Sequence, residues 1–293
     1  MSRLLHWEWE VRSQHHPLKH FLQEEKKMSR RTLTFIKRFG ELRVNGKKTN
    51  VNTVITNGDL VTVGMPLTDH PEHFSENNQT IDILFEDKHL IVVNKQPGMS
   101  TLPTQGVRGR SLAEAIMHYA RISEQYFGVH PVNRLDRFTS GIVVFAKHRY
   151  AHDFLTKSFH DKRYIAVVDG QFPVEEKKIS LPIGRHRSSI VERQVTVTGK
   201  PAKTIVKRIE EHKRYTVLSV KLFTGRTHQI RVHLSAIGYP IVGDTLYGSI
   251  SNQLNRQALH AANYVTVHPI TQKPIQFYAP TPKDIVQLLS INL

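Results

Sequence analysis

Short apolar runs bordered by polar residues recur along the chain after residue 80. The runs are rich in Val and Ile and alternate with turn residues, which is the pattern of buried and half-buried strands. We predict strands within "IDILFED", "HLIVVNK", "GIVVFAK", "RYIAVVDG", "AKTIVKRI" and "RYTVLSVKLF". Neighbouring runs are separated by turns as short as Asp87-Lys88, and strands joined so tightly pair antiparallel. The pattern therefore predicts an α+β domain around a mixed, largely antiparallel central sheet.

Helices are predicted where apolar positions recur roughly every three or four residues. Ser111, with Glu114 following in the same turn, forms a capping box ahead of one apolar stripe. Three further segments carry a helical pattern, namely "YAHDFLTKSFH", "THQIRVHLSAIG" and "PKDIVQLLSI". We expect these helices to flank the sheet and complete its core.

A basic helix is predicted near the start of the chain, in "MSRRTLTFIKRFG". Ser29 is placed to cap its N-terminus, because a serine oxygen accepts hydrogen bonds from the first free backbone N–H groups. Gly40 ends it, since glycine readily leaves the helical conformation. The apolar face of this helix leaves Lys37 and Arg38 pointing outward.

A tight turn follows at Asn45-Gly46, and the next two residues are Lys47 and Lys48. Residues 66–80 are polar and lack any period, which predicts a linker. We therefore divide the chain into a small α/β module at residues 1–67, a linker at 68–80 and a larger domain at 81–293. The larger domain is expected to have a core of its own.

The charge balance points to an anionic partner. The 293 residues include 41 Lys and Arg against 25 Asp and Glu, a formal charge of +16. Between Lys19 and Lys48, ten basic residues stand against three acidic ones. Such an excess favours nucleic acid. A membrane surface is the weaker alternative, because the sequence has no lipidation motif or long basic amphipathic helix.

Composition excludes several classes of protein. The absence of cysteine rules out disulfides, thiol nucleophiles and thiolate zinc sites. No apolar stretch of about 18 residues is present, and the first residues lack the apolar segment of a signal peptide. We therefore expect a cytoplasmic protein without a membrane span. There is no Walker loop, dinucleotide fingerprint or Gly-x-Ser-x-Gly motif. His148 and His152 are interpreted as a surface pair rather than as metal ligands.

The stretch "PVNRLDRFTSGIVVFAK" holds the first candidate for chemistry. Asp136 lies between Arg134 and Arg137 in a polar turn, directly before the apolar run at 141–146. A lone acid between two bases is the pattern of a surface ion pair, which contributes little to stability. Its position before a buried strand raises the question of a functional role.

A second polar cluster, "LFTGRTHQIRVH", places Arg226, His228 and Arg231 around the first turns of a predicted helix. Free N–H groups there already attract anions, so cations are unfavourable unless a carboxylate or phosphate lies opposite. A solvated basic helix start is the alternative. In "HDKRYIAVVDG", Tyr164 follows two basic residues. An aromatic ring beside positive charge can stack on nucleic-acid bases. The alternative is that Tyr164 is an ordinary half-buried strand residue.

"NRLDRFTSG" closely resembles the signature His-Arg-Leu-Asp-Arg-x-Thr-Ser-Gly of the RluA-type pseudouridine synthases, in which the aspartate is essential. "VNKQPGMS", "RYIAVV", "GRTHQIRVHL" with "PIVGDTLYG", and "ALHAANYVTVHPIT" resemble the other blocks of that family, in the same order. The resemblance covers roughly residues 80–280. The first module likewise resembles the small RNA-binding domain named after a ribosomal small-subunit protein.

The resemblance implies the pseudouridine synthase fold, with an RNA cleft, and isomerisation of a uridine already in RNA. It implies that Asp136 is the essential nucleophile or base and that Arg226 pairs with it. Tyr164 would stack on the target uracil and help to remove its C5 proton. Arg134 would occupy the stack that the flipped base leaves, or hold its phosphate. No metal or organic cofactor is expected, because the reaction involves no net oxidation or hydrolysis.

We expect the partner to be RNA, with ribosomal RNA favoured over transfer RNA, and the protein to be a monomer. Contacts to RNA are predicted for basic residues of both parts of the chain: Arg134, Arg137, Arg231, Lys37, Arg38, Lys47 and Lys48. Two other functions stay open. One is a non-catalytic RNA-binding or ribosome-assembly protein, and the other is a base glycosylase, which would release free uracil.

Two residues depart from the family pattern. Asn133 stands in place of the signature histidine, and Gln96 is inserted between Lys95 and Pro97. Neither departure touches the aspartate.

Overall fold

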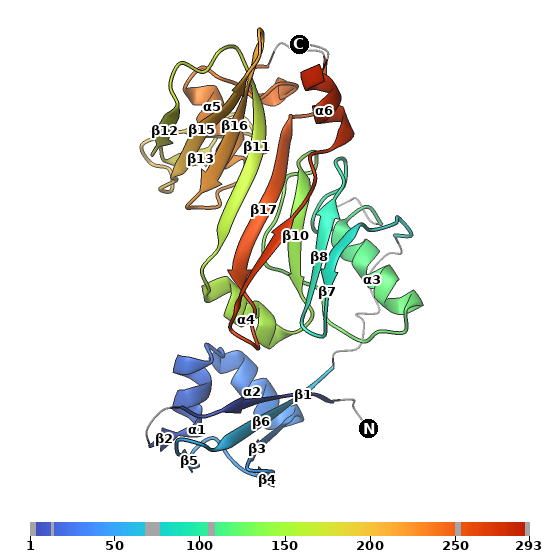
Figure 1. Cartoon of the computed structure of the whole chain (residues 1–293), viewed down its shortest axis with the longest axis vertical. Helices are drawn as coiled ribbons and strands as arrows, with labels where there is room; N and C mark the ends of the chain where they lie inside the picture. Colours follow the sequence, from blue (N-terminus) through green and yellow to red (C-terminus); the bar gives the residue numbers. More distant parts are fainter. Residues whose placement is uncertain (1–3, 13–14, 68–76, 105–108, 250–252, 291–293) are drawn as a thin grey trace.

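The chain folds into an elongated molecule with a small N-terminal part at one end and a long central sheet above it (Figure 1). The computed structural model describes all residues except 1–3, 13–14, 68–76, 105–108, 250–252 and 291–293. Most of the predicted linker, at 68–80, therefore lies outside the described residues, and the division of the chain into three segments stays a prediction. No helix among the described residues is long and apolar enough to cross a membrane.

The N-terminal part is built on a four-stranded antiparallel sheet in the order β1-β6-β3-β4. Its strands are β1 (Leu4–Glu10), β3 (Glu41–Val44), β4 (Lys47–Lys48) and β6 (Leu60–Pro66), and β2 (His16–Pro17) pairs with β5 (Val54–Ile55). Its helices are α1 (Leu18–His20), a π-helical turn at Phe21–Glu25, and α2 (Arg30–Phe39). The sequence pattern does not predict β1, because this strand pairs with β6, which is distant along the chain.

Local signals in this part act as predicted. The Oγ of Ser29 accepts a hydrogen bond of 3.0 Å from the backbone N–H of Thr32, and Gly40 is the C-cap of α2. Asn45 and Gly46 have φ values of 49° and 78° and join β3 to β4. Two positive φ values are what a tight hairpin turn requires, so the turn confirms the prediction.

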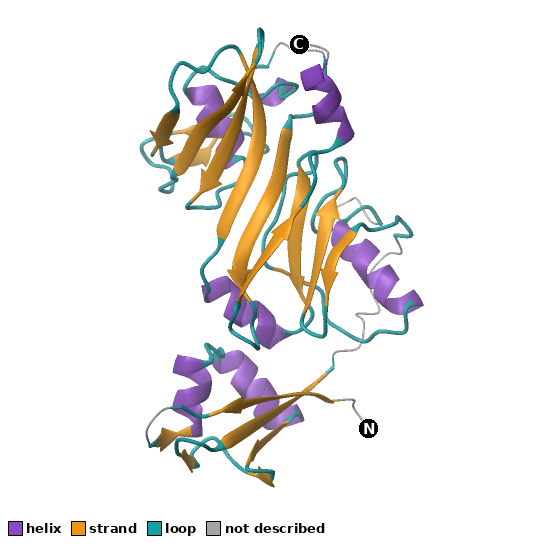
Figure 2. Ribbon diagram, viewed as in Figure 1, coloured by secondary structure: helices purple, strands orange, loops and turns teal. Residues whose placement is uncertain are grey.

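The central sheet runs in the order β12-β15-β16-β11-β17-β10-β8-β7, with β9 paired to β10 and β18 paired to β17 (Figure 2). All neighbouring pairs are antiparallel except β10 and β17. The sheet is thus mixed and largely antiparallel, and each of the six predicted runs contains a strand. The strands are β7 (Ile83–Glu86), β8 (Leu90–Lys95), β9 (His130–Pro131), β10 (Ser140–Ala146), β11 (Asp161–Asp169), β12 (Glu176–Ile179), β15 (Thr204–Glu211), β16 (Tyr215–Leu222), β17 (Leu259–Val267) and β18 (Pro274–Tyr278).

Four helices flank this sheet, as predicted (Figure 2). They are α3 (Leu112–Ile122), α4 (Arg149–Lys157), α5 (Gln229–Ala236) and α6 (Lys283–Ser290), and a small hairpin is formed by β13 (Ile183–Arg185) and β14 (Arg193–Val195). The capping box is present: the Oγ of Ser111 accepts from the backbone of Glu114, whose carboxylate accepts from the backbone of Ser111. It holds the start of α3 in place.

Gly141 allows the one parallel pairing in the sheet. It has a φ of +112° and pairs with Ala261 of β17. A Cβ at this position would lie 2.3 Å from the carbonyl oxygen of Ala261, so no other residue fits without moving a strand. The close approach fixes where β10 begins, and the loop before β10 carries Asp136.

The N-terminal part and the central sheet share one apolar cluster. Trp7 stacks on Tyr150 of α4, with ring centroids 5.4 Å apart, and on the His148 ring at 5.3 Å. Trp9 meets Tyr150 edge-on at 5.4 Å. The same cluster includes Val92 and other residues of the sheet. Residues of the predicted larger domain also form a core cluster by themselves, as expected. On this second face, however, removing the first 67 residues would expose the rings of α4 to water.

His148 also corrects a second expectation. It is buried rather than at the surface, and it is the N-cap of α4, where its Nδ1 accepts from the backbone of Ala151 at 3.2 Å. Its Nε2 lies 2.9 Å from Nδ1 of His89. A spacing of four residues suggested one helix face, but His148 precedes the helix and faces the junction with Trp7.

Candidate active site

The loop between β9 and β10 presents Asp136. The side chain of Asn133 ties this loop to β10, since it donates to one backbone carbonyl at 3.0 Å and accepts from one backbone N–H at 2.8 Å. The hydroxyl of Thr101 exchanges two hydrogen bonds of 3.0 Å with the backbone of Leu135. The residue that replaces the signature histidine thus anchors the loop from within, and Asp136 is held at a defined place.

Arg231 is the charged partner of Asp136. Its Nη1 donates to Oδ2 of Asp136 at 3.3 Å, while its Nε and Nη2 donate to the two oxygens of Asp244 at 2.7 and 2.9 Å. Burial opposes the charge of this guanidinium, but the two carboxylates outweigh burial and raise the pKa of Arg231. The arginine is therefore a fixed, fully charged support for Asp136.

In the described part of the chain, the charged groups within 4.0 Å of Asp136 belong to Arg231 and His228, and the predicted pairing of Arg226 with Asp136 stays a prediction. Arg226 is exposed, and its Nε donates to the carbonyl of Pro201 at 3.1 Å. Its backbone N–H is held by the side chain of Gln229, the first residue of α5. The helix starts after Arg226, and both arginines line the Asp136 cleft, but the ion pair with Asp136 is made by Arg231. Arg231 is buried and bonded to two carboxylates, and its predicted contact with RNA stays a prediction.

His228 is a second neighbour of Asp136, with Nε2 3.9 Å from Oδ2. Its Nδ1 lies 2.8 Å from the hydroxyl of Tyr247, and this hydroxyl accepts from the backbone N–H of Arg193 at 2.9 Å. The tyrosine proton is thus free to be donated to Nδ1, which leaves the imidazole proton on Nε2, facing the carboxylate. Burial lowers the pKa of His228, so the ring is neutral. The sequence placed His228 in the cluster but assigned it no role.

Tyr164 lies across the same cleft on β11. It is buried, and burial together with the nearby charge of Asp136 raises its pKa, so the phenol keeps its proton. The cleft has a volume of about 820 Å³, and its lining includes Asp136, Tyr164, Arg134, His228 and Arg231. A space of this size accommodates a nucleotide. The structure thus brings together residues from three separate stretches of sequence, at 134–136, 164 and 228–231.

Lys95 is a buried cation that the prediction of site residues missed. It ends β8, and its Nζ donates to the carbonyls of Gln96, Met99 and Arg137 at 3.1, 2.8 and 3.1 Å. Burial lowers its pKa to about 7, against the opposing effect of Asp136. A lysine that ends an otherwise apolar strand was the signal for it in the sequence.

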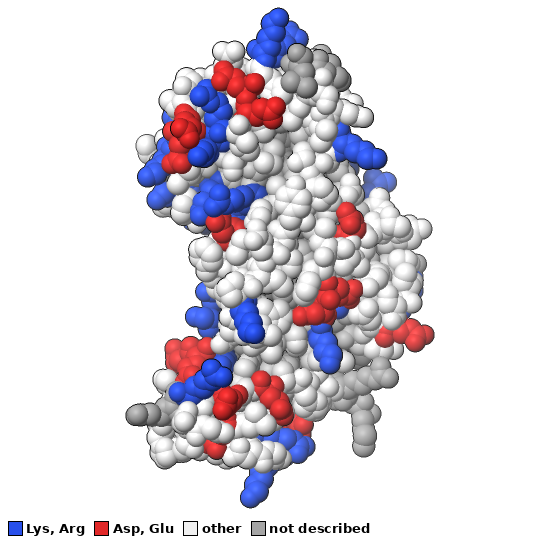
Figure 3. Space-filling model, in the orientation of Figure 1, with Lys and Arg blue, Asp and Glu red and all other residues white. Residues whose placement is uncertain are grey.

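The remaining predicted RNA contacts lie outside the lining of the cleft, apart from Arg134. Arg137 is exposed, but its Nε donates to the carbonyl of Gly98 at 3.0 Å. In the N-terminal part, four exposed basic side chains occupy the last turn of α2 and the β4 strand: Lys37, Arg38, Lys47 and Lys48. Figure 3 shows Lys and Arg side chains on both ends of the molecule.

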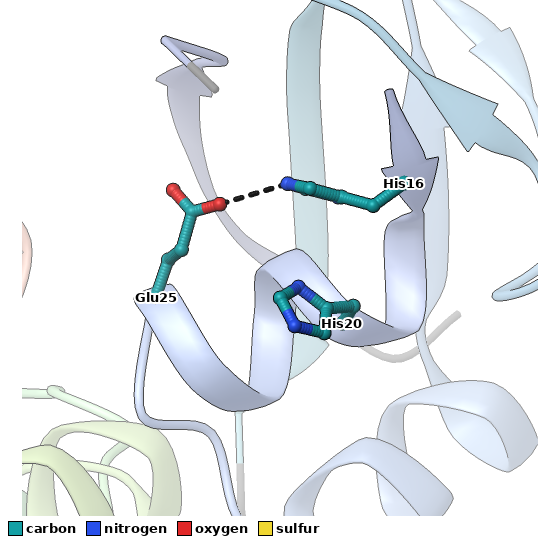
Figure 4. A group of neighbouring side chains, drawn as sticks. All are labelled: His16, His20 and Glu25. Carbon is teal, nitrogen blue, oxygen red and sulfur yellow. Dashed lines mark hydrogen bonds and ion pairs between the residues drawn. The ribbon is translucent and has the colours of Figure 1, made fainter. Parts of the chain in front are cut away.

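A cluster in the N-terminal part could hold a metal ion. Among the described residues, His16, His20 and Glu25 form the one group of three potential ligands, with ligand atoms within 4.8 Å of one another (Figure 4). Nε2 of His16 is already hydrogen-bonded to Glu25 at 2.9 Å. None of the three residues lines the Asp136 cleft, so the cluster does not bear on the chemistry there.

Residues 89–236 match the family model described as RNA pseudouridylate synthase. The chain therefore belongs to the RNA pseudouridine synthase family, whose members are isomerases, and the matched segment contains Asp136, Tyr164 and Arg231. The resemblance inferred from the sequence is confirmed at the level of the family.

Individual relatives cover most of the chain. The uncharacterized RNA pseudouridine synthase YjbO of Bacillus subtilis (strain 168) is 41% identical, over 89% of this chain and 94% of its own. Ribosomal large subunit pseudouridine synthase D of Zymomonas mobilis is 36% identical, over 79% of this chain and 78% of its own. The solved structure of human RNA pseudouridylate synthase domain containing 1 has a TM-score of 0.59 at 24% identity, covering 71% of this chain and 86% of that one. It shares the fold.

Proposed function

We propose that this enzyme converts uridine to pseudouridine in large-subunit ribosomal RNA, with Asp136 as the essential carboxylate. The observation that carries the proposal is the asymmetry of the Asp136 pair. The Asp136 side chain is 25% exposed and lines the cleft, whereas Arg231 is 8% exposed behind it. The carboxylate can therefore meet a substrate while its counter-charge stays fixed and dry.

The reaction needs a carboxylate more than any other group. The bond from N1 of uracil to C1′ of ribose must break, the base must turn, and C5 must bond to C1′. Breaking the first bond develops positive charge at C1′, which Asp136 can capture or stabilise. Alternatively, Asp136 removes a ribose proton. In either case C5 loses a proton and N1 gains one, so the product is an isomer and no oxidant is required.

Tyr164 and Arg134 handle the base. Tyr164 is the aromatic face in the cleft against which uracil stacks, and its hydroxyl is close enough to Asp136 that the carboxylate charge disfavours the phenolate and helps to raise its pKa. Its oxygen can then take part in moving the C5 proton. Arg134 is exposed at the cleft and fills the space left in the RNA stack, or holds the phosphate of the flipped nucleotide.

We favour large-subunit ribosomal RNA as the substrate. Relatives named ribosomal large subunit pseudouridine synthase D match most of this chain. We further propose that the N-terminal part is an RNA-binding domain of the ribosomal small-subunit type, contacting phosphates through Lys37, Arg38, Lys47 and Lys48. Their exposure and the formal charge of +16 support this role. We propose that the enzyme acts in the cytoplasm as a monomer and without a cofactor.

The decisive variant is Asp136→Asn. It keeps the shape of the side chain and removes the charge, so isomerisation should fall by about 10³-fold or more while affinity for RNA stays within a few-fold. Tritium released from C5-labelled uridine in unmodified ribosomal and transfer RNA transcripts measures both the activity and the choice of RNA. Asp82→Asn, an exposed aspartate away from the cleft, is the matched control. Appreciable turnover by Asp136→Asn would disprove the assignment.

Tyr164→Phe separates stacking from proton transfer. The ring remains, so binding of the transcript should survive, and product formation should fall if the hydroxyl takes part. Mapping pseudouridine in cells with and without the gene then identifies the RNA. Release of free uracil in place of pseudouridine would indicate a glycosylase instead.

A further inference from the structure

A second hollow adjoins the Asp136 cleft at the junction with the N-terminal part. It has a volume of about 300 Å³ and is lined by Glu25, Lys27, Phe154, Lys157, Ser158, Phe159, Val267 and Gln272. Ser158 lines both this hollow and the cleft. His160 and Lys162, which follow Ser158 at every second residue, line the cleft. We refer to this space as the junction hollow. The two spaces therefore meet at Ser158.

Phe159 is the unusual residue of the junction hollow. Its side chain is 65% exposed, although the backbone around it is held firmly. The carbonyl of Phe159 accepts from Oγ1 of Thr266 at 3.3 Å, and the ring of His160 is bonded to the carbonyl of Leu155 at 2.6 Å and to the hydroxyl of Tyr264 at 3.0 Å. An aromatic ring is thus presented to solvent at a fixed position.

Positive charge lies on both sides of this ring. Lys27 and Lys157 are exposed at the junction hollow, and Nζ of Lys157 donates to the carbonyl of Lys27 at 3.2 Å, which joins the two parts of the chain. Lys162 stands on the cleft side. The one acidic residue in the lining, Glu25, is hydrogen-bonded to His16 at 2.9 Å. The charge therefore favours an anionic occupant.

We propose that the junction hollow binds an unpaired nucleotide of the RNA near the target uridine, with its base stacked on Phe159 and its phosphate held by Lys27 and Lys157. An exposed aromatic ring between cations is the arrangement that binds single-stranded RNA, because every base has a face for stacking. The continuity through Ser158 makes the occupant part of the same strand that enters the cleft. This inference rests on the proposed function and adds that the substrate is single-stranded beside its target.

The test compares Phe159→Ala with Tyr278→Ala, whose side chain is 64% exposed and lines neither space. Fluorescence anisotropy measures binding of full-length protein to a single-stranded oligouridylate and to an RNA duplex. Phe159→Ala should weaken binding of the single strand about tenfold, and Phe159→Trp should restore it. On an unmodified transcript, KM should rise with little change in kcat. Lys157→Gln, compared with Lys177→Gln, should reduce the slope of affinity against salt.

Each outcome has a separate meaning. If Phe159→Ala binds the single strand as tightly as Tyr278→Ala does, the nucleotide site is refuted. Equal weakening for single strand and duplex would refute stacking on an unpaired base. If the wild-type protein forms no pseudouridine in any transcript, the proposed function fails, and the oligouridylate comparison still decides the junction hollow.

Discussion

The cleft around Asp136 and the junction around Trp7 are built in opposite ways. In the cleft, one buried guanidinium serves two carboxylates, Asp136 and Asp244. At the junction, Trp7 and Trp9 stack on Tyr150, and the stability comes from apolar area removed from water. A buried charge pair fails when either partner is lost, whereas an aromatic contact weakens with the area removed.

The difference separates chemistry from stability in this protein. The cleft is polar and partly open, and the Asp136 carboxylate in its lining is accessible from outside. The junction around Trp7, which is distinct from the junction hollow, contains none of the proposed catalytic residues. Its aromatic rings hold the N-terminal part against α4. Variants of the cleft should therefore lose isomerisation activity, whereas variants of the junction should lose stability and keep kcat.

The largest effect is expected for Arg231→Met. It leaves Asp244 buried without its partner and Asp136 without support, so the free energy of unfolding should fall by about 3 to 5 kcal/mol. Isomerisation should fall at least about 100-fold. Arg226→Met is the matched control, because Arg226 is exposed and bonds only a carbonyl in the described structure. Equal damage from both variants, measured by tritium release and urea unfolding, would contradict the pairing of Arg231 with Asp136.

Trp7→Ala tests the junction. Trp7 is 5% exposed, and its loss should lower the free energy of unfolding by about 3 kcal/mol. The value of kcat on saturating RNA should change little, because the rings that contact Trp7 belong to Trp9, His89, His148 and Tyr150, and none of these four residues lines the cleft. Phe39→Ala removes an exposed ring from the same part of the chain and should be nearly neutral. A loss of kcat in Trp7→Ala that exceeds its loss of stability would mean that the two regions are not separate.

Lys95→Met tests a third kind of buried contact. The ammonium group of Lys95 is hydrogen-bonded to three backbone carbonyls, whereas Arg231 is paired with carboxylates. Three carbonyl oxygens lose a donor, which should cost about 1 to 3 kcal/mol. The pKa of about 7 is lower than that of a lysine in the unfolded chain, so above pH 7 the unfolded chain binds the extra proton. The free energy of unfolding of the wild type therefore rises as the pH increases from 7 toward the pKa of an unfolded lysine, and it falls again as the pH returns to 7. Urea unfolding at pH 7 and at pH 9 measures this change. The free energy of unfolding should rise more between the two pH values in the wild type than in Lys95→Met, and an equal change in both proteins would exclude this titration.

The smallest effect is expected for Tyr247→Phe. It removes the hydroxyl that fixes the proton of His228 on Nε2, at a cost of about 1 kcal/mol, or roughly fivefold to tenfold in rate. Nitrogen NMR of His228 should show a mixture of tautomers in the variant and one tautomer in the wild type. The effect on the rate should depend on pH where His228 titrates. An unchanged tautomer would rule out this role of Tyr247.

The sequence by itself determined the local structure and the position of the carboxylate. Ser29, Ser111 and Asn45-Gly46 mark the ends of elements because capping and turn geometry depend on residues only a few positions apart. The six apolar runs became strands because each needs a core on at least one face. Asp136 was found from its motif, which is continuous in the sequence.

Only the tertiary structure decided which groups meet. Arg226 and Arg231 have the same charge and lie on one short segment, but Arg231 is 95 residues from Asp136, and the start of α5 at Gln229 selects it. The junction was missed for the same reason, since Trp7 meets Tyr150 only after the sheet is assembled. Sequence patterns record each residue's near neighbours. Contacts between distant residues depend on how the sheet and helices pack.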